Sequence, residues 1–114
     1  MHINKIKTLE PFKNPTNNFR KEYEKLDHDN LKLPKDIYEP YKEIWETKTW
    51  YDLLGFNNIY TSLDVFRKNF SKKYPSVKKI NKKNYKKIQN EFNLPNYPFE
   101  YYRIKNIDDY GDLI

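Results

Sequence analysis

The sequence predicts an all-α protein, a small domain of short helices around an aromatic-rich core. Of its 114 residues, 18% are aromatic, which argues against disorder because disordered chains are poor in large rings. Apolar residues recur at three- and four-residue steps, as one helix face requires, and no stretch shows β alternation. Only two glycines are present, so few tight hairpin turns are available. At this length we expect a single domain over residues 1–114.

Capping residues and prolines predict where each helix of the first half begins and ends. Asn17 or Asn18 can cap a helix. The Leu33-Pro34 step ends it, because the residue before a proline is pushed out of the helical region. The buried face of this helix would consist of Phe19, Tyr23 and Leu26.

A short helical turn over residues 50–54 is predicted next. Thr49 can cap it, and Gly55 follows where a positive φ is easily adopted. The two tryptophans are expected to anchor the core. Asp52 would lie in the first turn, where the helix dipole favours a carboxylate, so a structural role is expected in preference to a catalytic one.

Two longer helices are predicted in the second half. The stretch Thr61-Ser62-Leu63-Asp64 has the spacing of a capping box, and Pro75 stops the helix that follows it. Asn81 can cap the next helix, which ends at Leu94-Pro95. Their buried stripes would be Leu63, Phe66, Phe70 and Tyr74 on the first, and Tyr85, Ile88 and Phe92 on the second.

The two halves contain an ordered series of matching residues. The offset between matches is 62 residues at Tyr23, 61 at Pro34 and 60 at Asp52. Two single-residue insertions or deletions explain this drift. We therefore predict an internal duplication, with a partial first copy over residues 17–55 and a second copy over residues 60–114.

The first copy resembles a known repeat family. Leu33-Pro34, Tyr41, Trp45 and the run from Trp50 to Gly55 are similar to the phage-integrase repeat unit, and residues 60–67 are similar to its opening helix. The resemblance covers about residues 19–114. Such repeats stand beside integrase and helicase domains, so the resemblance implies a helical fold and work on DNA. It does not by itself imply a chemistry.

The second copy departs from this family at its two tryptophan positions. Asn106 or its neighbour stands in place of the first tryptophan, and Tyr110 stands in place of the second.

The residues expected of an enzyme are missing. Without cysteine there is no thiolate nucleophile, disulfide or thiolate metal site, and the isolated glycines cannot form a phosphate-binding loop. Asp27-His28-Asp29 has metal-ligating residue types, but neighbours in the chain rarely converge on one ion, so we favour a solvated loop histidine. Only three arginines are available to support a tyrosine nucleophile. We expect no enzymatic activity, no cofactor and no metal.

The net charge of +6 comes entirely from the second half of the sequence. Residues 1–57 contain ten basic and ten acidic residues, whereas residues 58–114 contain twelve and six. No acidic residue lies between Val65 and Asn90. The candidate nucleic-acid-binding residues of this span are Arg67, Lys68, Lys72, Lys73, Lys78, Lys79, Lys82, Lys83, Lys86 and Lys87. Like charges repel, so a polyanion partner is the simplest reason for the cluster. A solvated helical surface is the alternative.

The predicted function is a non-enzymatic nucleic-acid-binding module of a phage or mobile element. The helix pair would contact phosphates, and the resemblance favours DNA over RNA. Lysine is a point charge, so weak sequence specificity is expected. Two alternatives stay open: a small phage-type protein that inhibits a host nucleoprotein, and a structural subunit of a ribonucleoprotein assembly.

The acidic residues of the first half would face a basic host protein if the first of these alternatives holds. They are Glu22, Glu24, Asp27, Asp29, Glu39, Glu43 and Glu46.

No apolar run is long enough to cross a bilayer. We therefore expect no membrane partner, and a cytoplasmic location in the nucleoid or the host cytosol.

Overall fold

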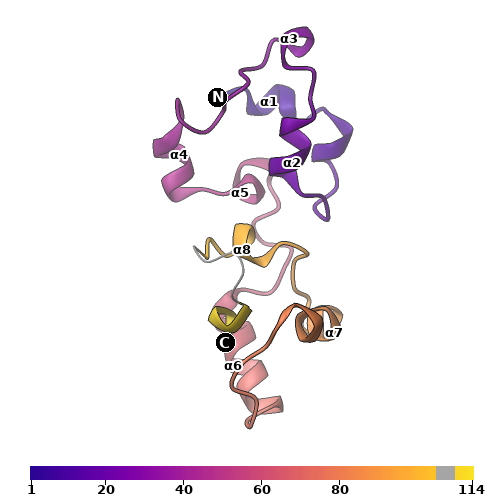
Figure 1. The fold of residues 1–114 in the computed structure, drawn as a ribbon, viewed down its shortest axis with the longest axis vertical. Coiled ribbons are helices and arrows are strands. Elements are labelled where there is room, and N and C mark those ends of the chain that lie inside the picture. Colours follow the sequence, from indigo (N-terminus) through magenta and orange to yellow (C-terminus); the bar gives the residue numbers. More distant parts are fainter. Residues whose placement is uncertain (105–109) are drawn as a thin grey trace. The chain divides into compact units, whose positions relative to one another are not determined.

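The computed structural model describes residues 1–104 and 110–114. Its described residues form helices and no strand, which confirms the all-α class. The chain divides into two compact units, Met1–Asn57 and Asn58–Ile114 (Figure 1). This boundary also separates the charge-neutral half from the basic half. The single domain over residues 1–114 stays a prediction.

The first unit is built from very short helices packed around one tryptophan. Trp50 is fully buried. The centroids of its rings lie 5.0 Å from Trp45, 5.4 Å from Phe12 and 5.7 Å from Tyr23. No helix of this unit exceeds six residues, so ring packing carries most of its burial. The elements are α1 (Ile3–Ile6), η1 (a 3-10 helix, Glu10–Phe12), α2 (Phe19–Glu24), α3 (His28–Leu31), α4 (Lys42–Thr47) and α5 (Trp50–Leu54).

The first predicted helix is divided in two. The side chain of Asn18 caps α2 by accepting a hydrogen bond from the backbone of Lys21 at 3.3 Å, as predicted. The helix then ends at Glu24, well before the Leu33-Pro34 step. The carboxylate of Asp27 accepts from the backbone N–H of Asn30 at 3.2 Å and begins α3. Asp27 thus offers the backbone a cap in place of a continuous helix.

The turn at α5 is capped at both ends as the sequence predicts. The hydroxyl of Thr49 accepts from the backbone of Asp52 at 3.3 Å, and the carboxylate of Asp52 accepts from the backbone of Thr49 at 2.8 Å. Gly55 closes the helix at φ 84°. Asp52 is therefore a capping residue. The side chain of Asp112, its counterpart in the predicted second copy, lies outside the described part, as do Asn106 and its neighbours.

The second unit contains the two longest helices of the described chain. In Figure 1, α6 runs along the picture whereas α7 is seen nearly end-on, so the two helices cross at a steep angle. The core between them consists of Phe66, Phe70, Ile80, Tyr85, Leu94 and Leu113. The elements are α6 (Leu63–Lys73), α7 (Lys82–Phe92), α8 (Pro98–Tyr101) and η2 (a 3-10 helix, Tyr110–Leu113).

The start of α6 lies one residue later than predicted. Ser62 is the cap, accepting from the backbone of Val65 at 3.3 Å. Thr61 is instead held in the preceding segment, because its N–H donates to the carbonyl of Asn93 at 3.0 Å and its carbonyl accepts from the hydroxyl of Tyr102. The predicted cap of α7 is confirmed: the side chain of Asn81 accepts from the backbone of its third helical residue at 2.9 Å.

The two units make the same tyrosine contact at positions that the sequence pairs. The hydroxyl of Tyr23 donates to the carbonyl of Pro34, and the hydroxyl of Tyr85 donates to the carbonyl of Pro95. Each ring also packs against the first residue of the closing helix of its unit, with centroids 5.7 Å apart in the first unit and 5.4 Å apart in the second. These matched contacts support the predicted duplication, which stays a prediction.

A residue in the left-handed backbone conformation precedes the Leu-Pro step in both units. Lys32 has φ 55° and Asn93 has φ 54°. The leucine that follows, Leu33 or Leu94, donates its N–H to the carbonyl five residues earlier, at 2.9 Å in each case. This is the hydrogen bond of a helix ending in the left-handed conformation. Neither residue is a glycine, so each unit contains some backbone strain at this turn.

Replacing the strained lysine should therefore stabilise the first unit. We expect Lys32→Gly to raise the free energy of unfolding by about 0.5–1 kcal/mol, because glycine adopts positive φ without a steric cost. Chemical denaturation monitored by circular dichroism measures the change. Lys7→Gly is the matched control, since Lys7 also closes a short helix but at φ −56°. A gain of similar size in the control would contradict the explanation.

Alkaline pH should weaken the fold through its buried tyrosines. Burial raises the pKa of Tyr23 from 10.0 to about 12, and it also raises the pKa of Tyr102. The folded state thus favours the neutral phenol, and this contribution is fully present below about pH 10 and lost as the pH rises through about 12. We expect the melting temperature to fall across that window, and to fall less in Tyr23→Phe. Parallel pH profiles for the two proteins would contradict this assignment.

Candidate nucleic-acid interface

Four lysines form a basic face on α7. Lys82, Lys83, Lys86 and Lys87 follow one another at one- and four-residue steps, so they occupy an arc of about 140° around the helix. Tyr85 is buried on the other side of α7. All four lysines are exposed. We call these four residues the α7 basic face.

The electrostatics of the α7 basic face are unfavourable within the protein itself. Lys82 and Lys83 open the helix, whose first turn contains no acidic residue, although the helix dipole disfavours positive charge there. The spacing also makes two like-charged pairs at four residues and one at three residues, each unfavourable. Within residues 1–104 and 110–114, none of the four lysines forms an ion pair. A bound anion would offset these costs.

On α6, unlike α7, the charged residues at the helix ends are placed as the helix dipole favours. Asp64 lies in the first turn of this helix, and Lys72 and Lys73 lie in its last turn, as the dipole favours. Lys68 and Lys72 are exposed and lie four residues apart, on the side of α6 away from the buried Phe66. Helix stability alone therefore accounts for much of the charge on α6.

Among the residues that the structure describes, two of the ten predicted residues form a hydrogen bond or ion pair through their side chains. The guanidinium of Arg67 donates through Nε to the carbonyl of Leu113 at 3.2 Å. Lys73 forms an ion pair with Glu91. These two cations connect α6 to the rest of the second unit.

The ten predicted residues therefore lie on more than one surface. Four of them share the α7 basic face, and Lys78 and Lys79 are exposed in the connection that leads into α7. The remaining four belong to α6. Contact with nucleic acid stays a prediction for all ten residues.

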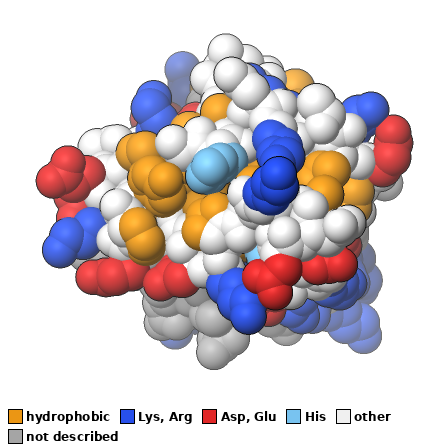
Figure 2. All heavy atoms as spheres, turned by 90° about the horizontal axis from the view of Figure 1, so that it is seen from above, with side chains coloured by type: hydrophobic (Ala, Val, Ile, Leu, Met, Phe, Trp, Pro, Cys, Tyr) orange, Lys and Arg blue, Asp and Glu red, His pale blue; other side chains and the backbone are white. Residues whose placement is uncertain are grey.

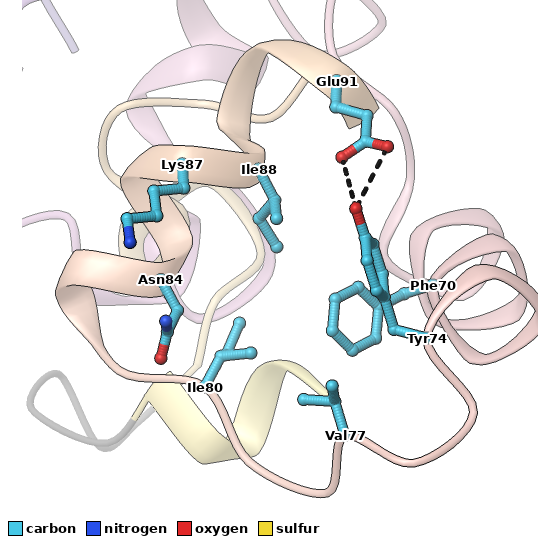
Figure 3. Close-up of a pocket in the computed structure, with 8 residues that line it drawn as sticks. All are labelled: Phe70, Tyr74, Val77, Ile80, Asn84, Lys87, Ile88 and Glu91. Carbon is cyan, nitrogen blue, oxygen red and sulfur yellow. Dashed lines mark hydrogen bonds between the residues drawn. The ribbon is translucent and has the colours of Figure 1, made fainter.

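The structure also shows a hollow that sequence reasoning missed. It lies between the end of α6, the connection and α7, and has a volume of about 470 Å³ (Figure 3). We call it the aromatic hollow. The sequence signal was the pair of branched apolar residues, Val77 and Ile80, on either side of the two connection lysines. Its lining residues are Phe70, Tyr74, Val77, Ile80, Asn84, Lys87, Ile88 and Glu91.

A second hollow lies against another side of α7. It has a volume of about 640 Å³ and is lined by Lys82 and Lys86, by several side-chain amides, and by the rings of Tyr97 and Phe99. Lysines of the α7 basic face thus border both hollows, with Lys87 at the aromatic hollow.

The first unit has a different charge pattern. Its charged residues include local pairs, with Lys13 3.0 Å from Glu10 and Lys25 3.7 Å from Glu22. On the face drawn in Figure 2, basic and acidic side chains are interspersed with hydrophobic ones.

The histidine of the Asp27-His28-Asp29 stretch has a structural role, contrary to the solvated loop histidine expected. His28 opens α3 and is half-buried. Its Nε2 lies 2.7 Å from the carbonyl oxygen of Tyr23 and donates to it, and its ring lies 4.9 Å from the ring of Tyr23.

In the described part of the chain, no three His, Asp or Glu residues are placed to hold a metal ion. No described helix is both long and apolar enough to cross a membrane.

Comparisons with protein-family models, with curated proteins and with solved structures found no match to this chain. The resemblance to the phage-integrase repeat unit therefore remains an expectation from the sequence motifs.

Neutralising the α7 basic face should leave the fold intact and make it slightly more stable. In the fourfold variant Lys82→Gln, Lys83→Gln, Lys86→Gln and Lys87→Gln, three like-charge repulsions disappear, two at a spacing of four residues and one at three, whereas helix propensity hardly changes. We expect the free energy of unfolding to rise by roughly 0.5–1 kcal/mol at low salt. This rise should vanish at high salt, because salt screens the repulsion. Urea unfolding at the two salt concentrations measures it. A clear loss of stability would show that these lysines support the fold.

Proposed function

We propose that this protein binds nucleic acid without catalysing a reaction, and that the α7 basic face contacts the phosphates. One observation carries the proposal: four exposed lysines share one helix face, two of them in the first turn where the helix dipole disfavours positive charge, without an ion pair among the described residues. Neither helix stability nor packing accounts for this arrangement. A polyanion would turn the same repulsion into binding energy.

The geometry of α7 suits a phosphate backbone. Lysines four residues apart lie about 6 Å apart along the helix axis, so one row can reach successive phosphates of a strand. Each phosphate that a lysine neutralises releases condensed counterions, which supplies most of a non-specific affinity. Lysine gives no bidentate contact to a base edge, so binding should depend weakly on sequence.

The motifs of the first copy support a DNA partner. Their resemblance to the phage-integrase repeat unit favours DNA over RNA and a phage or mobile element as the setting. Inhibition of a host nucleoprotein has less support, because some of the acidic residues it would use are engaged locally. Glu22 pairs with Lys25 at 3.7 Å, and Asp27 caps α3.

Binding should be strongly salt-dependent and should need the α7 basic face. We expect fluorescence anisotropy with labelled single-stranded DNA, duplex DNA and RNA to give a logarithmic affinity that falls linearly with the logarithm of salt concentration. The fourfold α7 variant should bind at least about tenfold more weakly. The slope of its logarithmic affinity against the logarithm of salt concentration should be shallower by roughly 3, because each lost phosphate contact removes about 0.7–0.9 from that slope.

The matched control removes four exposed lysines from the first unit: Lys5, Lys7, Lys42 and Lys48, each replaced by glutamine. It has the same net charge as the α7 variant, so it separates a local interface from a general charge effect. An equal loss in both variants would contradict an interface on α7. No binding to any of the three nucleic acids at low salt would overturn the proposed function.

A further inference from the structure

The aromatic hollow leaves apolar surface of the second unit open to solvent. In Figure 3 the rings of Phe70 and Tyr74 line one side of the space, and the branched side chains of Val77, Ile80 and Ile88 lie around it. Tyr74 is half-buried, and 39% of Val77 is exposed. The volume of about 470 Å³ falls within the range of roughly 300–1,000 Å³ typical of small-ligand sites.

The tyrosine ring at this hollow is held in place before any ligand binds. The Tyr74 hydroxyl donates to the carboxylate of Glu91, with oxygen–oxygen distances of 3.1 and 3.4 Å. The centroid of the ring lies 5.3 Å from that of Phe70 and 6.4 Å from that of Phe92. A flat group that stacks on this ring would therefore lose little affinity to ordering of the protein.

The charge around the hollow is positive. Lys87 lines it, Lys83 lies one turn earlier on α7, and Lys78 and Lys79 lie between its lining residues Val77 and Ile80. Among the described lining residues, the one carboxylate is that of Glu91, which forms an ion pair with Lys73. A suitable occupant has apolar faces and is attached to negative charge.

A nucleobase on its phosphate backbone has this chemistry. Bases stack on aromatic side chains whatever their identity, whereas lysines hold the phosphates on either side. In a duplex the faces of the bases are already stacked inside, so a base that enters a protein hollow must be unpaired or flipped out. The combination of the aromatic hollow and the lysines thus favours single-stranded over double-stranded nucleic acid.

We propose that this protein binds single-stranded nucleic acid, and that the aromatic hollow receives one unpaired base while the α7 basic face holds neighbouring phosphates. The inference rests on the proposed function, because without nucleic-acid binding the hollow has no base to receive.

The first test compares three probes of equal length by fluorescence anisotropy: a thymidine strand, the same strand with abasic sites at every position, and a duplex. The abasic strand has the same phosphates, so it isolates the contribution of the bases. We expect the thymidine strand to bind about tenfold more tightly than the abasic strand. Equal binding of these two strands overturns base insertion but leaves nucleic-acid binding intact. Binding of none of the probes overturns the proposed function instead.

The second test locates the base with three variants. Tyr74→Leu removes the ring, and we expect the ratio of thymidine to abasic affinity to fall several-fold. Tyr74→Phe retains the ring without the hydroxyl and should restore the ratio, which separates stacking from the bond to Glu91. Tyr97→Leu removes a ring of the second hollow and should leave the ratio unchanged. If the ratio of thymidine to abasic affinity falls in Tyr97→Leu and does not fall in Tyr74→Leu, the assignment to the aromatic hollow is overturned.

A third measurement on the unaltered protein does not depend on how the variants fold. A thymidine strand that contains 4-thiothymidine is irradiated in the complex, and mass spectrometry identifies the cross-linked peptide. We expect the cross-link within residues 70–80 or on α7 at the hollow, near Ile88. Cross-links confined to other peptides overturn the inference.

Discussion

One buried tyrosine determines which way α7 presents its charges. Tyr85 packs inside the second unit, and its hydroxyl donates to the carbonyl of Pro95, just after the helix ends. A rotation of α7 about its axis would break both contacts, so they favour this one orientation of the helix. Burying a large ring contributes roughly 1.5–3 kcal/mol, whereas repulsion between two exposed lysines four residues apart costs only about 0.2–0.5 kcal/mol. Packing therefore outweighs repulsion, and the lysines remain together on the exposed side.

The same contact in the first unit shows how a chain without alanine forms such small cores. Tyr23 packs on Trp50 and donates to the carbonyl of Pro34. Helices of four to six residues have little stability of their own. Large rings compensate, because each buries much apolar area and its polar end can satisfy a turn carbonyl. Capping side chains such as Thr49 and Asn81 then satisfy the helix ends.

The positive charge of the second unit has two different physical explanations. On α6 the charges follow the helix dipole, and Arg67 and Lys73 bind other groups of the unit. On α7 the first two lysines oppose the dipole, and all four repel one another. This contrast favours α7 over α6 as the proposed interface, although composition alone treats all ten residues as one cluster. The aromatic hollow beside it adds a feature that a purely structural lysine surface does not need.

The features that could be predicted from the sequence alone depend on local interactions. The helical class, the caps at Asn18, Thr49 and Asn81, and the left-handed Gly55 depend on residues within about four positions of one another, and all are confirmed. The shared exposed side of the α7 lysines also follows from their spacing, because helix periodicity is local.

The features that depend on distant partners could be seen only in the folded structure. The start of α6 moved by one residue because Thr61 is bonded to Asn93 and to Tyr102, 41 residues away. The aromatic hollow exists because α6 and α7 cross, and its Tyr74 ring is held by Glu91 from the other helix. Such contacts join segments whose separation in space no local pattern specifies, so only the folded chain brings them together.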